Sequence, residues 1–457
     1  MRVFTKFRKA GLLERLMRAT LPGRTAFLCG LLVFWSCLGL ALGQTVSIPD
    51  TPAGKVLEAW FDAFNSGDRA KIDAYIKTFD PQQSADMFFS FRRQTGGFDL
   101  MGIESSEPKL IKFRVKEKAS PTIAIGSIQL NDAQPPVVES FGLRAIPPGA
   151  VVENIKLDAA ARQRVLEGVE SNLKQSYVYP ETAQKMIEAL LDHQKQGAYN
   201  SITDGDVFAG RLTKDLEDVS HDKHLRVNYS PYKLPPDGDK PNPDDKEMER
   251  KQVAQANCGF VKVEILPGNI GYLKFNFFAN PDLCAPTAIA AMNFLSHVSA
   301  IIFDLRENGG GDPKMVAFVS SYLFDKPTHL NDLYNREKDE TTQYWTLPYV
   351  PGTRLADTPA FVLTSSRTFS GAEEFSYNLK NLKRATIVGE TTGGGAHPVE
   401  GHRIDDHFMI GVPFARAINP ISKTNWEGSG VTPDVAARAS DALEAAEKLA
   451  SAKAQSN

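Results

Sequence analysis

The chain has 457 residues, which is too long for one ordinary domain and suggests about three. Its 42% hydrophobic and 23% charged residues are typical of a globular protein and exclude a disordered one. Residues 1–43 hold seven of the 52 Lys and Arg and one of the 55 Asp and Glu, which leaves 45 basic against 54 acidic residues. This mildly acidic body argues against nucleic acid as the main partner.

The first 43 residues predict a signal peptide. A basic segment precedes an uncharged apolar run over 26–42, and Ala41-Leu42-Gly43 supplies small residues for cleavage before Gln44. The chain is therefore expected to be exported, either to the periplasm or as a secreted protein. The apolar run is also long enough for the alternative, an uncleaved membrane anchor, and only in that case is a membrane a partner.

The cysteine content agrees with export. Cys29 and Cys37 lie in the signal segment, and Cys258 and Cys284 remain in the body of the chain. An even pair in an oxidising compartment favours a disulfide, and two buried thiols are the alternative. The spacing of the pair fits no metal site.

Residues 44–150 predict a small α+β accessory domain. Helices first and alternating strands later favour a curved sheet folded around a helix. The helices are expected over 56–65 and 69–76, and the strands over 111–115, 122–129 and 137–144. The motif A-W-F-x-A-F-N-S-G-D resembles the opening helix of the ketosteroid-isomerase-like, or cystatin-like, cone fold. Four phenylalanines of this domain are assigned to packing in its core, and the alternative is that they line a pocket. They are Phe88, Phe89, Phe91 and Phe98.

Residues 151–230 predict a helical domain, with helices over 158–176, 179–195 and 204–220. After the third helix the apolar pattern changes from helical to alternating, so His224 lies at a corner between a helix and a strand. A lone histidine in such a place is usually structural or merely exposed. His224 becomes a candidate catalytic residue only in combination with other motifs.

Residues 231–256 are rich in Pro, Asp and Lys and predict a mobile linker. The core domain follows over 257–437. Its first elements are strands over 261–266 and 270–275, a helix over 286–298, a buried strand over 300–305 and a helix over 315–323. Between the last two lies the turn Asn308-Gly-Gly-Gly-Asp312. Three adjacent glycines exceed what a tight connection requires, and such a turn leaves backbone N–H groups free to hold an anion or an oxyanion.

A second strand–turn–helix unit carries a candidate nucleophile. An apolar strand over 361–363 and a helix over 372–382 flank Ser370-Gly371. The Ser370 hydroxyl is expected beside the free N–H groups of the first helical turn, as in a nucleophile elbow, although the G-x-S-x-G pattern is absent. The alternative is a capping box between Ser370 and Glu373 with no chemical role.

The end of the core predicts two further strands and two loops. A strand over 386–388 runs into Gly389-Glu-Thr-Thr-Gly-Gly-Gly-Ala-His-Pro398, which again holds more glycine than an ordinary turn needs. A strand over 408–412 and a polar loop over 425–434 follow. Residues 438–457 form a C-terminal segment with a helix over 441–454.

Five motifs in this order resemble the C-terminal-processing (tail-specific) serine peptidase family, in its tricorn and interphotoreceptor retinoid-binding-protein-like branch. They are D-K-H-L-R-V, D-L-R-E-N-G-G-G, T-S-x-x-T-F-S-G-A-E-E-F, G-E-T-T-G-G-G-A-H-P and E-G-x-G-V-x-P-D. The resemblance covers about residues 152–437 and leaves the accessory domain uncovered. It implies an α/β core of the ClpP/crotonase-like β-β-α type, preceded by the helical domain, in which a serine attacks a peptide bond.

The resemblance also implies roles for particular residues. In one branch of the family a lysine downstream of the serine is the base, and the corresponding segment here, 391–397, has no lysine. In the tricorn branch a histidine of the preceding domain is the base, and a downstream glutamate supports it. His224 and Glu427 occupy these two positions, so a Ser370–His224–Glu427 scheme is expected.

This scheme suits the residue types. A serine hydroxyl needs a base within hydrogen-bond reach, and histidine can take that proton and return it to the leaving amine. A carboxylate such as Glu427 can hold the histidine tautomer or stabilise the imidazolium, either directly or through an intervening polar residue. Backbone N–H groups of Gly371 and of the glycine turn would meet the oxyanion, with Gly310 assigned by family position and Gly309 beside it. The alternative bases are His221 and His397.

One departure from the family concerns the substrate. Processing peptidases usually carry a PDZ module that grips the C-terminus of the substrate, and there is no room for one between Pro231 and Val261. The expected substrate is therefore an oligopeptide or a partly unfolded protein, with no cofactor and no metal. Two other functions stay open on the same fold: a catalytically silent binding module for an apolar ligand, and a small-molecule esterase or amidase.

Overall fold

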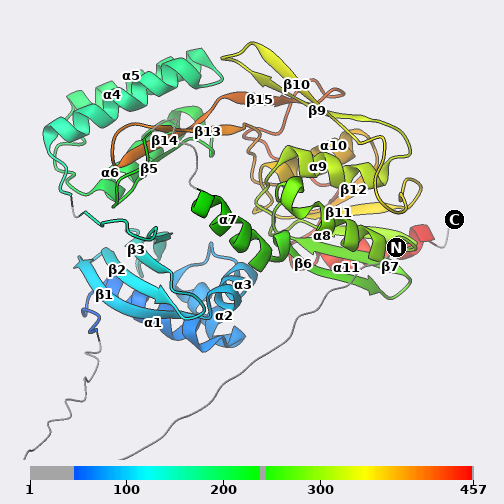
Figure 1. Cartoon of the computed structure of the whole chain (residues 1–457), viewed down its shortest axis with the longest axis horizontal. Coiled ribbons are helices and arrows are strands. Elements are labelled where there is room, and N and C mark those ends of the chain that lie inside the picture. The colour runs from blue at the N-terminus through cyan, green and yellow to red at the C-terminus, as the bar shows by residue number, and fades with distance from the viewer. Residues whose placement is uncertain (1–45, 154, 237–242, 455–457) are drawn as a thin grey trace, which may run out of the picture. The chain divides into compact units, whose positions relative to one another are not determined.

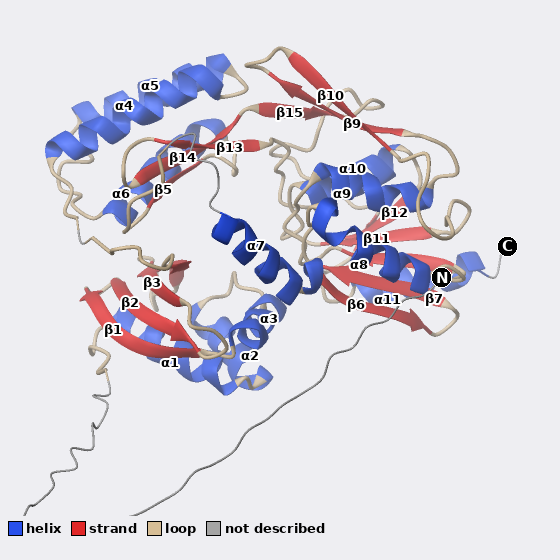
Figure 2. Ribbon diagram, viewed as in Figure 1, coloured by secondary structure: helices blue, strands red, loops and turns tan. Residues whose placement is uncertain are grey.

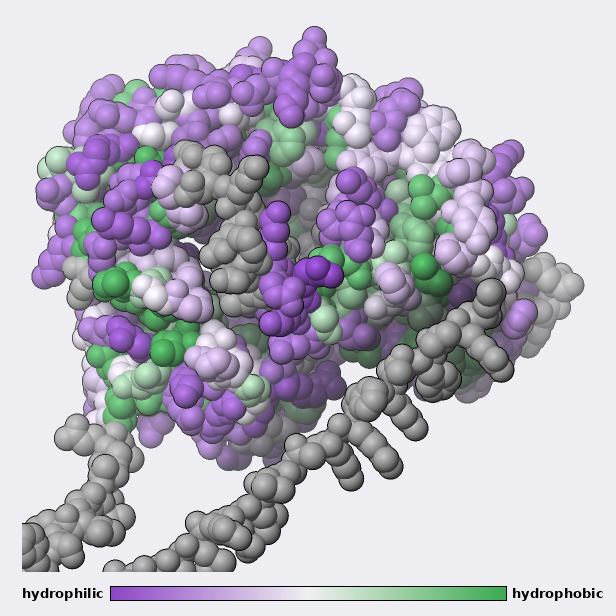
Figure 3. Space-filling model, viewed as in Figure 1, coloured by the Kyte–Doolittle hydropathy of each residue, from purple (hydrophilic) through white to green (hydrophobic). Residues whose placement is uncertain are grey.

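The computed structural model describes residues 46–153, 155–236 and 243–454 (Figure 1). The predicted signal peptide lies outside these ranges. Among the helices that are described, none has both the length and the apolar character needed to cross a bilayer. On the face shown in Figure 3, hydrophobic residues lie in small separate patches among hydrophilic ones.

The N-terminal domain places three helices against an antiparallel sheet with the strand order β1-β2-β3-β4. The first helix begins after the N-cap Thr51, whose side chain accepts the Gly54 N–H, and ends at Gly67 in the left-handed conformation. The elements are α1 (Pro52–Ser66), α2 (Arg69–Phe79), α3 (Ala85–Thr95), β1 (Phe98–Ser106), β2 (Leu110–Glu117), β3 (Ile123–Leu130) and β4 (Val138–Ala145). The expected α+β arrangement is present, and α3 and β1 were not predicted.

The four phenylalanines assigned to packing divide between the core and a cavity. Phe88 and Phe98 are buried in the domain core, and Phe89 packs against it. Phe91 is 37% exposed, and with Phe88 it lines a cavity in this domain. Packing alone was therefore the wrong assignment for Phe91 and an incomplete one for Phe88.

The helical region contains α4 (Ala159–Ser176), α5 (Pro180–Lys195) and α6 (Gly205–Ser220), close to the predicted bounds, and then β5 (Arg226–Tyr229). Pro180 opens α5 at a position where its missing N–H costs nothing. β5 pairs with β14 (Phe408–Pro413), which pairs in turn with β13 (Val399–Arg403). The core of this region therefore includes residues that follow Ser370 in the chain, which sequence order alone does not indicate.

The segment expected as a mobile linker contains the helix α7 (Pro243–Gln255). A mobile linker is therefore the wrong description of 243–255. The reason lies in composition: Glu, Lys, Met, Arg and Gln are good helix formers even though they give the segment a polar, linker-like character.

The core domain is built on a six-stranded sheet with the order β16-β12-β11-β8-β7-β6 (Figure 2). β6 is antiparallel to β7, and all other neighbours are parallel. The strands are β6 (Phe260–Leu266), β7 (Ile270–Phe275), β8 (Ala300–Asp304), β11 (Ala360–Thr364), β12 (Ala385–Gly389) and β16 (Val435–Ala436). A mixed α/β core behind a helical region is thus present.

Helices cover both faces of this sheet. Ile301 and Phe303 of β8 belong to the cluster that includes α8 (Pro281–Phe294), α9 (Pro313–Ser320) and α10 (Gly371–Asn381). Ile302 points to the other face, where α11 (Ala442–Ala454) packs. α8 begins five residues before the predicted start, because Asn280 caps it and Pro286, taken as its first residue, lies inside it.

Two further features border the core. A three-stranded sheet with the order β10-β9-β15 is built from β9 (His329–Asn335), β10 (Glu340–Trp345) and β15 (Ala415–Ile418). Cys258, in a short 3-10 helix before β6, forms a disulfide with Cys284 of α8, with the Cα atoms 5.6 Å apart.

Candidate active site

Ser370 sits on a strained turn between β11 and α10. Its backbone has φ 53° and ψ −121°, a conformation that residues with a side chain rarely adopt. The turn is fixed by neighbours, because the Thr368 hydroxyl donates to Leu305 O at 2.8 Å and the Phe369 N–H donates to Asn308 O at 3.0 Å. The side chain thereby lies at the N-terminus of α10, where Ser370 and Glu373 also form the capping box that was the alternative interpretation.

The glycine turn after β8 lies directly against this serine. Gly310 has φ 102°, and a Cβ there would stand 2.6 Å from the Ser370 Cβ, so only glycine fits. The N–H of Gly309 donates to Asn276 O at 3.0 Å, and that of Gly310 donates to Asn308 Oδ1 at 2.9 Å. Among the described residues, the N–H of Gly311 has no acceptor.

The orientation of these groups revises the expected oxyanion donors. Gly371 is the first residue of α10, so its N–H has no acceptor within the helix. Gly371 and Gly311 therefore offer free N–H groups beside Ser370. Gly309 and Gly310, the glycines favoured from the sequence, already donate to other groups in this structure.

His224 follows the tight turn that ends α6. Its ring centroid lies 4.7 Å from that of Phe369, the residue before Ser370, and its side chain is 14% exposed. Burial lowers the pKa of His224 to about 4, so the imidazole is neutral at pH 7, although the nearby Asp222 opposes this shift. The Nδ1 atom is buried and has no hydrogen-bond partner among the described residues, and Asp222 Oδ1 lies 3.9 Å from it.

The other two candidate bases are placed differently. His221 is the exposed C-cap of α6 in the left-handed conformation. His397 is 2% exposed, and its Nδ1 lies 2.6 Å from Asp222 Oδ2. Its Nε2 is buried without a partner in the described part of the chain. A ring so enclosed is less accessible to a substrate than that of His224.

The second glycine-rich loop packs on both His224 and Phe369. A Cβ on Gly395 would stand 2.6 Å from His224 Cε1 and 2.2 Å from Phe369 Cζ. Trp426 Nε1 donates to Gly395 O at 2.7 Å, and Lys223 Nζ donates to Gly393 O at 2.7 Å. The glycines thus allow the loop to lie flat against the aromatic rings of the site.

Glu373 is a site residue for which the sequence suggested only a capping role. Its carboxylate is fully buried and accepts four hydrogen bonds. The donors are the Ser370 N–H at 2.8 Å, the Gly395 N–H at 2.8 Å, the Gly394 N–H at 2.6 Å and the Thr392 hydroxyl at 2.5 Å. Burial raises the pKa of Glu373, and the four donors oppose that rise. One carboxylate therefore ties the serine to the glycine loop.

Glu427 lies beside His397. Its Oε2 accepts the Ala396 N–H at 2.5 Å and is 3.5 Å from His397 Nδ1. Burial raises the pKa of Glu427 to about 7, with a further contribution from Asp222. Within the described ranges, Glu427 makes no hydrogen bond to His224, and its nearest charged neighbour is His397, which contacts Asp222.

Asp222 joins these groups. Its Oδ1 accepts the backbone N–H of His224 at 3.0 Å, and its Oδ2 accepts from Tyr177 at 3.3 Å and contacts His397. Atoms of Asp222, His397 and Glu427 lie within 4.8 Å of one another, which is the size of a metal site. The 2.6 Å contact between His397 and Asp222 is a hydrogen-bond distance, and the cluster is described more simply as a hydrogen-bonded network.

The predicted motifs thus converge on one place. The site differs from the expected scheme in the contact between serine and base and in two residues that had no predicted chemical role. Ser370, the glycine turn, the glycine loop and the His224 ring are in mutual contact through Phe369 and Gly395. No hydrogen bond joins Ser370 to His224 among the described residues, a looseness common in free enzymes. Asp222 was not singled out from the sequence, and Glu373 was given only a capping role, although D-K-H and S-x-x-E are visible in it.

Comparison with known proteins identifies the class. Residues 269–437 match the model of peptidase family S41, and residues 153–267 match the N-terminal domain of peptidase S41 in eukaryotic IRBP. With a serine at the elbow and a glycine turn against it, the chain falls into the class of serine-type peptidases. Over these two segments the chain belongs to peptidase family S41.

Individual relatives are distant. The chain is similar to carboxyl-terminal-processing peptidase 2, chloroplastic, of Arabidopsis thaliana, with 27% identity over 37% of this chain and 33% of that protein. It is similar to the tricorn protease of Thermoplasma volcanium, with 26% identity over 42% of this chain and 17% of that protein. The chain thus matches a third or less of the length of these curated relatives. A solved lipoprotein from Streptococcus agalactiae has 14% identity and a TM-score of 0.44, and the match covers 65% of this chain and 99% of that one.

Proposed function

We propose that the chain is an exported serine endopeptidase that hydrolyses peptide bonds through an acyl-enzyme formed on Ser370. The observation that carries the proposal is the strained turn that presents Ser370 beside the free N–H groups of Gly371 and Gly311. Strain of this kind persists where the surroundings enforce it and is common at catalytic residues. We assign the core to the ClpP/crotonase-like type and the N-terminal domain to the cystatin-like cone type.

His224 serves as the general base. Its imidazole is neutral above pH 4 because burial lowers its pKa, so it can accept a proton over the whole neutral range. The ring takes the Ser370 proton as the hydroxyl attacks the peptide carbonyl, and it returns that proton to the leaving amine. A small movement of the ring, which is held by Phe369 and Gly395, closes the hydrogen bond to Ser370 in the substrate complex.

The N–H groups of Gly371 and Gly311 stabilise the oxyanion. Removal of one such donor typically costs about 2.7–4 kcal/mol of transition-state stabilisation. Gly310 becomes a further donor if the turn shifts and releases Asn308 Oδ1, which would bring the site to the arrangement expected from the sequence.

Glu427 supports the base indirectly. It contacts His397, and Asp222 contacts both His397 and the backbone of His224. Asp222 stabilises positive charge on His224 as it accepts the proton, because its carboxylate raises the pKa of that ring, and Glu427 and His397 hold Asp222 in its network. Glu427 is therefore a positioning residue in this proposal and does not touch the substrate.

The substrate is proposed to be an oligopeptide or a partly unfolded protein. β5 ends at Tyr229 and β6 begins at Phe260, and α7 occupies much of the segment between them, which is too short for a substrate-gripping PDZ module. Export to the periplasm or the medium is supported by the basic and apolar N-terminal sequence, with cleavage before Gln44. A disulfide between Cys258 and Cys284 is compatible with such a compartment.

Digestion of an unfolded protein tests the proposal. The mature chain is incubated with reduced casein, alongside Ser370→Ala and the matched control Ser366→Ala, which changes an exposed serine on the same loop. We expect cleavage by the wild type and by Ser366→Ala, and none by Ser370→Ala. Equal cleavage by Ser370→Ala, or no cleavage of casein or of a peptide library by the folded wild type, would contradict it.

A further inference from the structure

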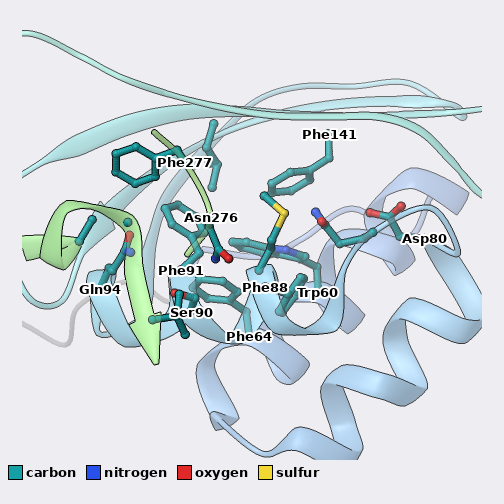
Figure 4. A pocket seen from close by; sticks show the side chains of 16 residues that line it. Trp60, Phe64, Asp80, Phe88, Ser90, Phe91, Gln94, Phe141, Asn276 and Phe277 are labelled. Atoms are coloured by element: carbon teal, nitrogen blue, oxygen red, sulfur yellow. The ribbon is translucent and has the colours of Figure 1, made fainter. Parts of the chain in front are cut away.

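A cavity of about 420 Å³, which the peptidase chemistry does not use, is lined by the N-terminal domain and by residues 256–277 (Figure 4). Aromatic rings form most of its wall. They come from α1, α3 and β4 and are Trp60, Phe64, Phe88, Phe91 and Phe141. The volume falls in the range of small-molecule pockets, roughly 300–1,000 Å³. Close packing in a small domain does not leave a space of this size.

Two unpartnered polar atoms belong to residues that line this cavity. The indole N–H of Trp60 makes no hydrogen bond within the described residues, and its nitrogen is not fully buried although the residue as a whole is 2% exposed. Asn276 Oδ1 is buried and likewise has no partner in the described ranges. A buried donor or acceptor without a partner costs about 1–3 kcal/mol, and a ligand that pairs with it recovers that cost.

Polar side chains also stand at the two ends of the cavity. Figure 4 shows Asp80 at one end and Gln94 at the other, with the aromatic rings between them. Burial raises the pKa of Asp80, because the surroundings disfavour the charged carboxylate. The wall therefore suits a neutral molecule with an apolar middle and polar groups at its ends.

The mouth of the cavity belongs to the segment that holds the glycine turn. Asn276 and Phe277, which line it, come from the end of β7 and the residues after it. Asn276 O accepts the N–H of Gly309, and the next residue but one, Phe278, donates its N–H to Gly310 O at 2.7 Å. A ligand in contact with Asn276 is thus one hydrogen bond away from the turn that borders Ser370.

We propose that this cavity binds a neutral, flat, largely aromatic small molecule that accepts a hydrogen bond from Trp60 Nε1 and donates one to Asn276 Oδ1. Its occupation changes the position of the glycine turn and hence the reactivity of Ser370. The site and its ligand class do not depend on which bonds the enzyme hydrolyses.

The test uses 6-acetyl-2-naphthol, a neutral naphthalene with a carbonyl acceptor at one end and a hydroxyl donor at the other. Isothermal titration of the mature chain at pH 6.5 measures its binding. Ser90→Phe fills the cavity from α3, and Ser140→Phe makes the same change at an exposed position of β4. We expect one site per chain in the wild type and in Ser140→Phe, and binding at least 10-fold weaker in Ser90→Phe.

Two further measurements sharpen the result. Replacing the hydroxyl of the probe with a methoxy group removes the donor and should weaken binding to the wild type about 2- to 10-fold, the effect of one net hydrogen bond. If Ser90→Phe fails to fold, as judged by circular dichroism, Leu143→Trp fills the same space from the sheet. Absence of saturable binding to the wild type, or equal binding by the cavity-filled variant and Ser140→Phe, overturns the site.

The link to the glycine turn has its own readout. Saturating naphthol should change the rate at which a fluorophosphonate labels Ser370 by at least 2-fold in Ser140→Phe and not at all in Ser90→Phe. Binding without any change in this rate overturns the link and retains the site. A protein that binds the naphthol but is never labelled retains the site and contradicts the proposed peptidase function instead.

Discussion

Glu373 is predicted to be indispensable for the fold of the site, and its neighbour Glu374 is not. Glu373→Gln keeps the shape of the side chain but replaces one carboxylate oxygen with an NH2 group. Each oxygen accepts from two donors, so two of the four donors then face the NH2 group, whichever oxygen it replaces. Hydrogen bonds to a charged group contribute about 1.5–3 kcal/mol each, so two lost bonds cost about 3–6 kcal/mol. Burying an amide is less costly than burying a carboxylate, so the net loss should lie near the lower limit.

Urea unfolding at pH 7, followed by circular dichroism, measures this loss as a fall in the free energy of unfolding. Glu374→Gln on the same helical turn is the matched control. Burial raises the pKa of Glu374 to about 8, so it is mostly protonated at pH 7 and its amide should be neutral or stabilising. The free energy of unfolding of Glu373→Gln could lie within about 1 kcal/mol of the wild-type value while the variant reacts with a fluorophosphonate at the wild-type rate. That result would show that the carboxylate does not hold the serine turn.

Three further predictions concern separate parts of the molecule. Because the folded pKa of Glu374 lies above its value of 4.5 in the unfolded chain, its contribution to stability is complete below pH 4.5 and declines as the pH rises to about 8. The free energies of unfolding at pH 5 and pH 8 should therefore differ less in Glu374→Gln than in the wild type. An equal difference in the two proteins would mean that a group other than Glu374 causes the pH dependence. Replacing both Cys258 and Cys284 with alanine opens a loop with a sequence separation of 26 residues and should cost about 3.5 kcal/mol, measured by urea unfolding against the oxidised wild type. Gly395→Ala would bring a methyl group to 2.6 Å from His224 Cε1, so casein hydrolysis should fall at least 10-fold while the far-ultraviolet spectrum is retained; full activity would mean that the ring is not held there.

The sequence predicted most of the core, because its patterns are local. Strands such as β8 and β11 are uninterrupted apolar runs that lead directly into turns, so their bounds were found within one residue. The helix α7 was missed because its residues combine helix propensity with a polar composition, and only the first of these properties determines its structure. The pairing of β5 with β14 was also missed, because two strands so far apart in the chain leave no local signal.

The candidate site, too, was predictable from the sequence only in part. The S-x-x-E and glycine motifs identified the elements that meet, because each motif has a local conformational cause. The partners of the side chains were not predictable. Glu427 contacts His397 instead of His224, and the N–H of Gly310 is already taken by Asn308. These contacts depend on the relative placement of loops from three different parts of the chain.

The most direct test of the proposed activity is the position of a covalent adduct. The mature chain is treated with a fluorophosphonate, and the modified residue is found by peptide mass mapping. We predict one adduct per chain on Ser370, no adduct in Ser370→Ala, and slower labelling in His224→Gln. An adduct on another serine, or a folded wild-type chain that stays unmodified, would contradict the assignment of Ser370 as the nucleophile.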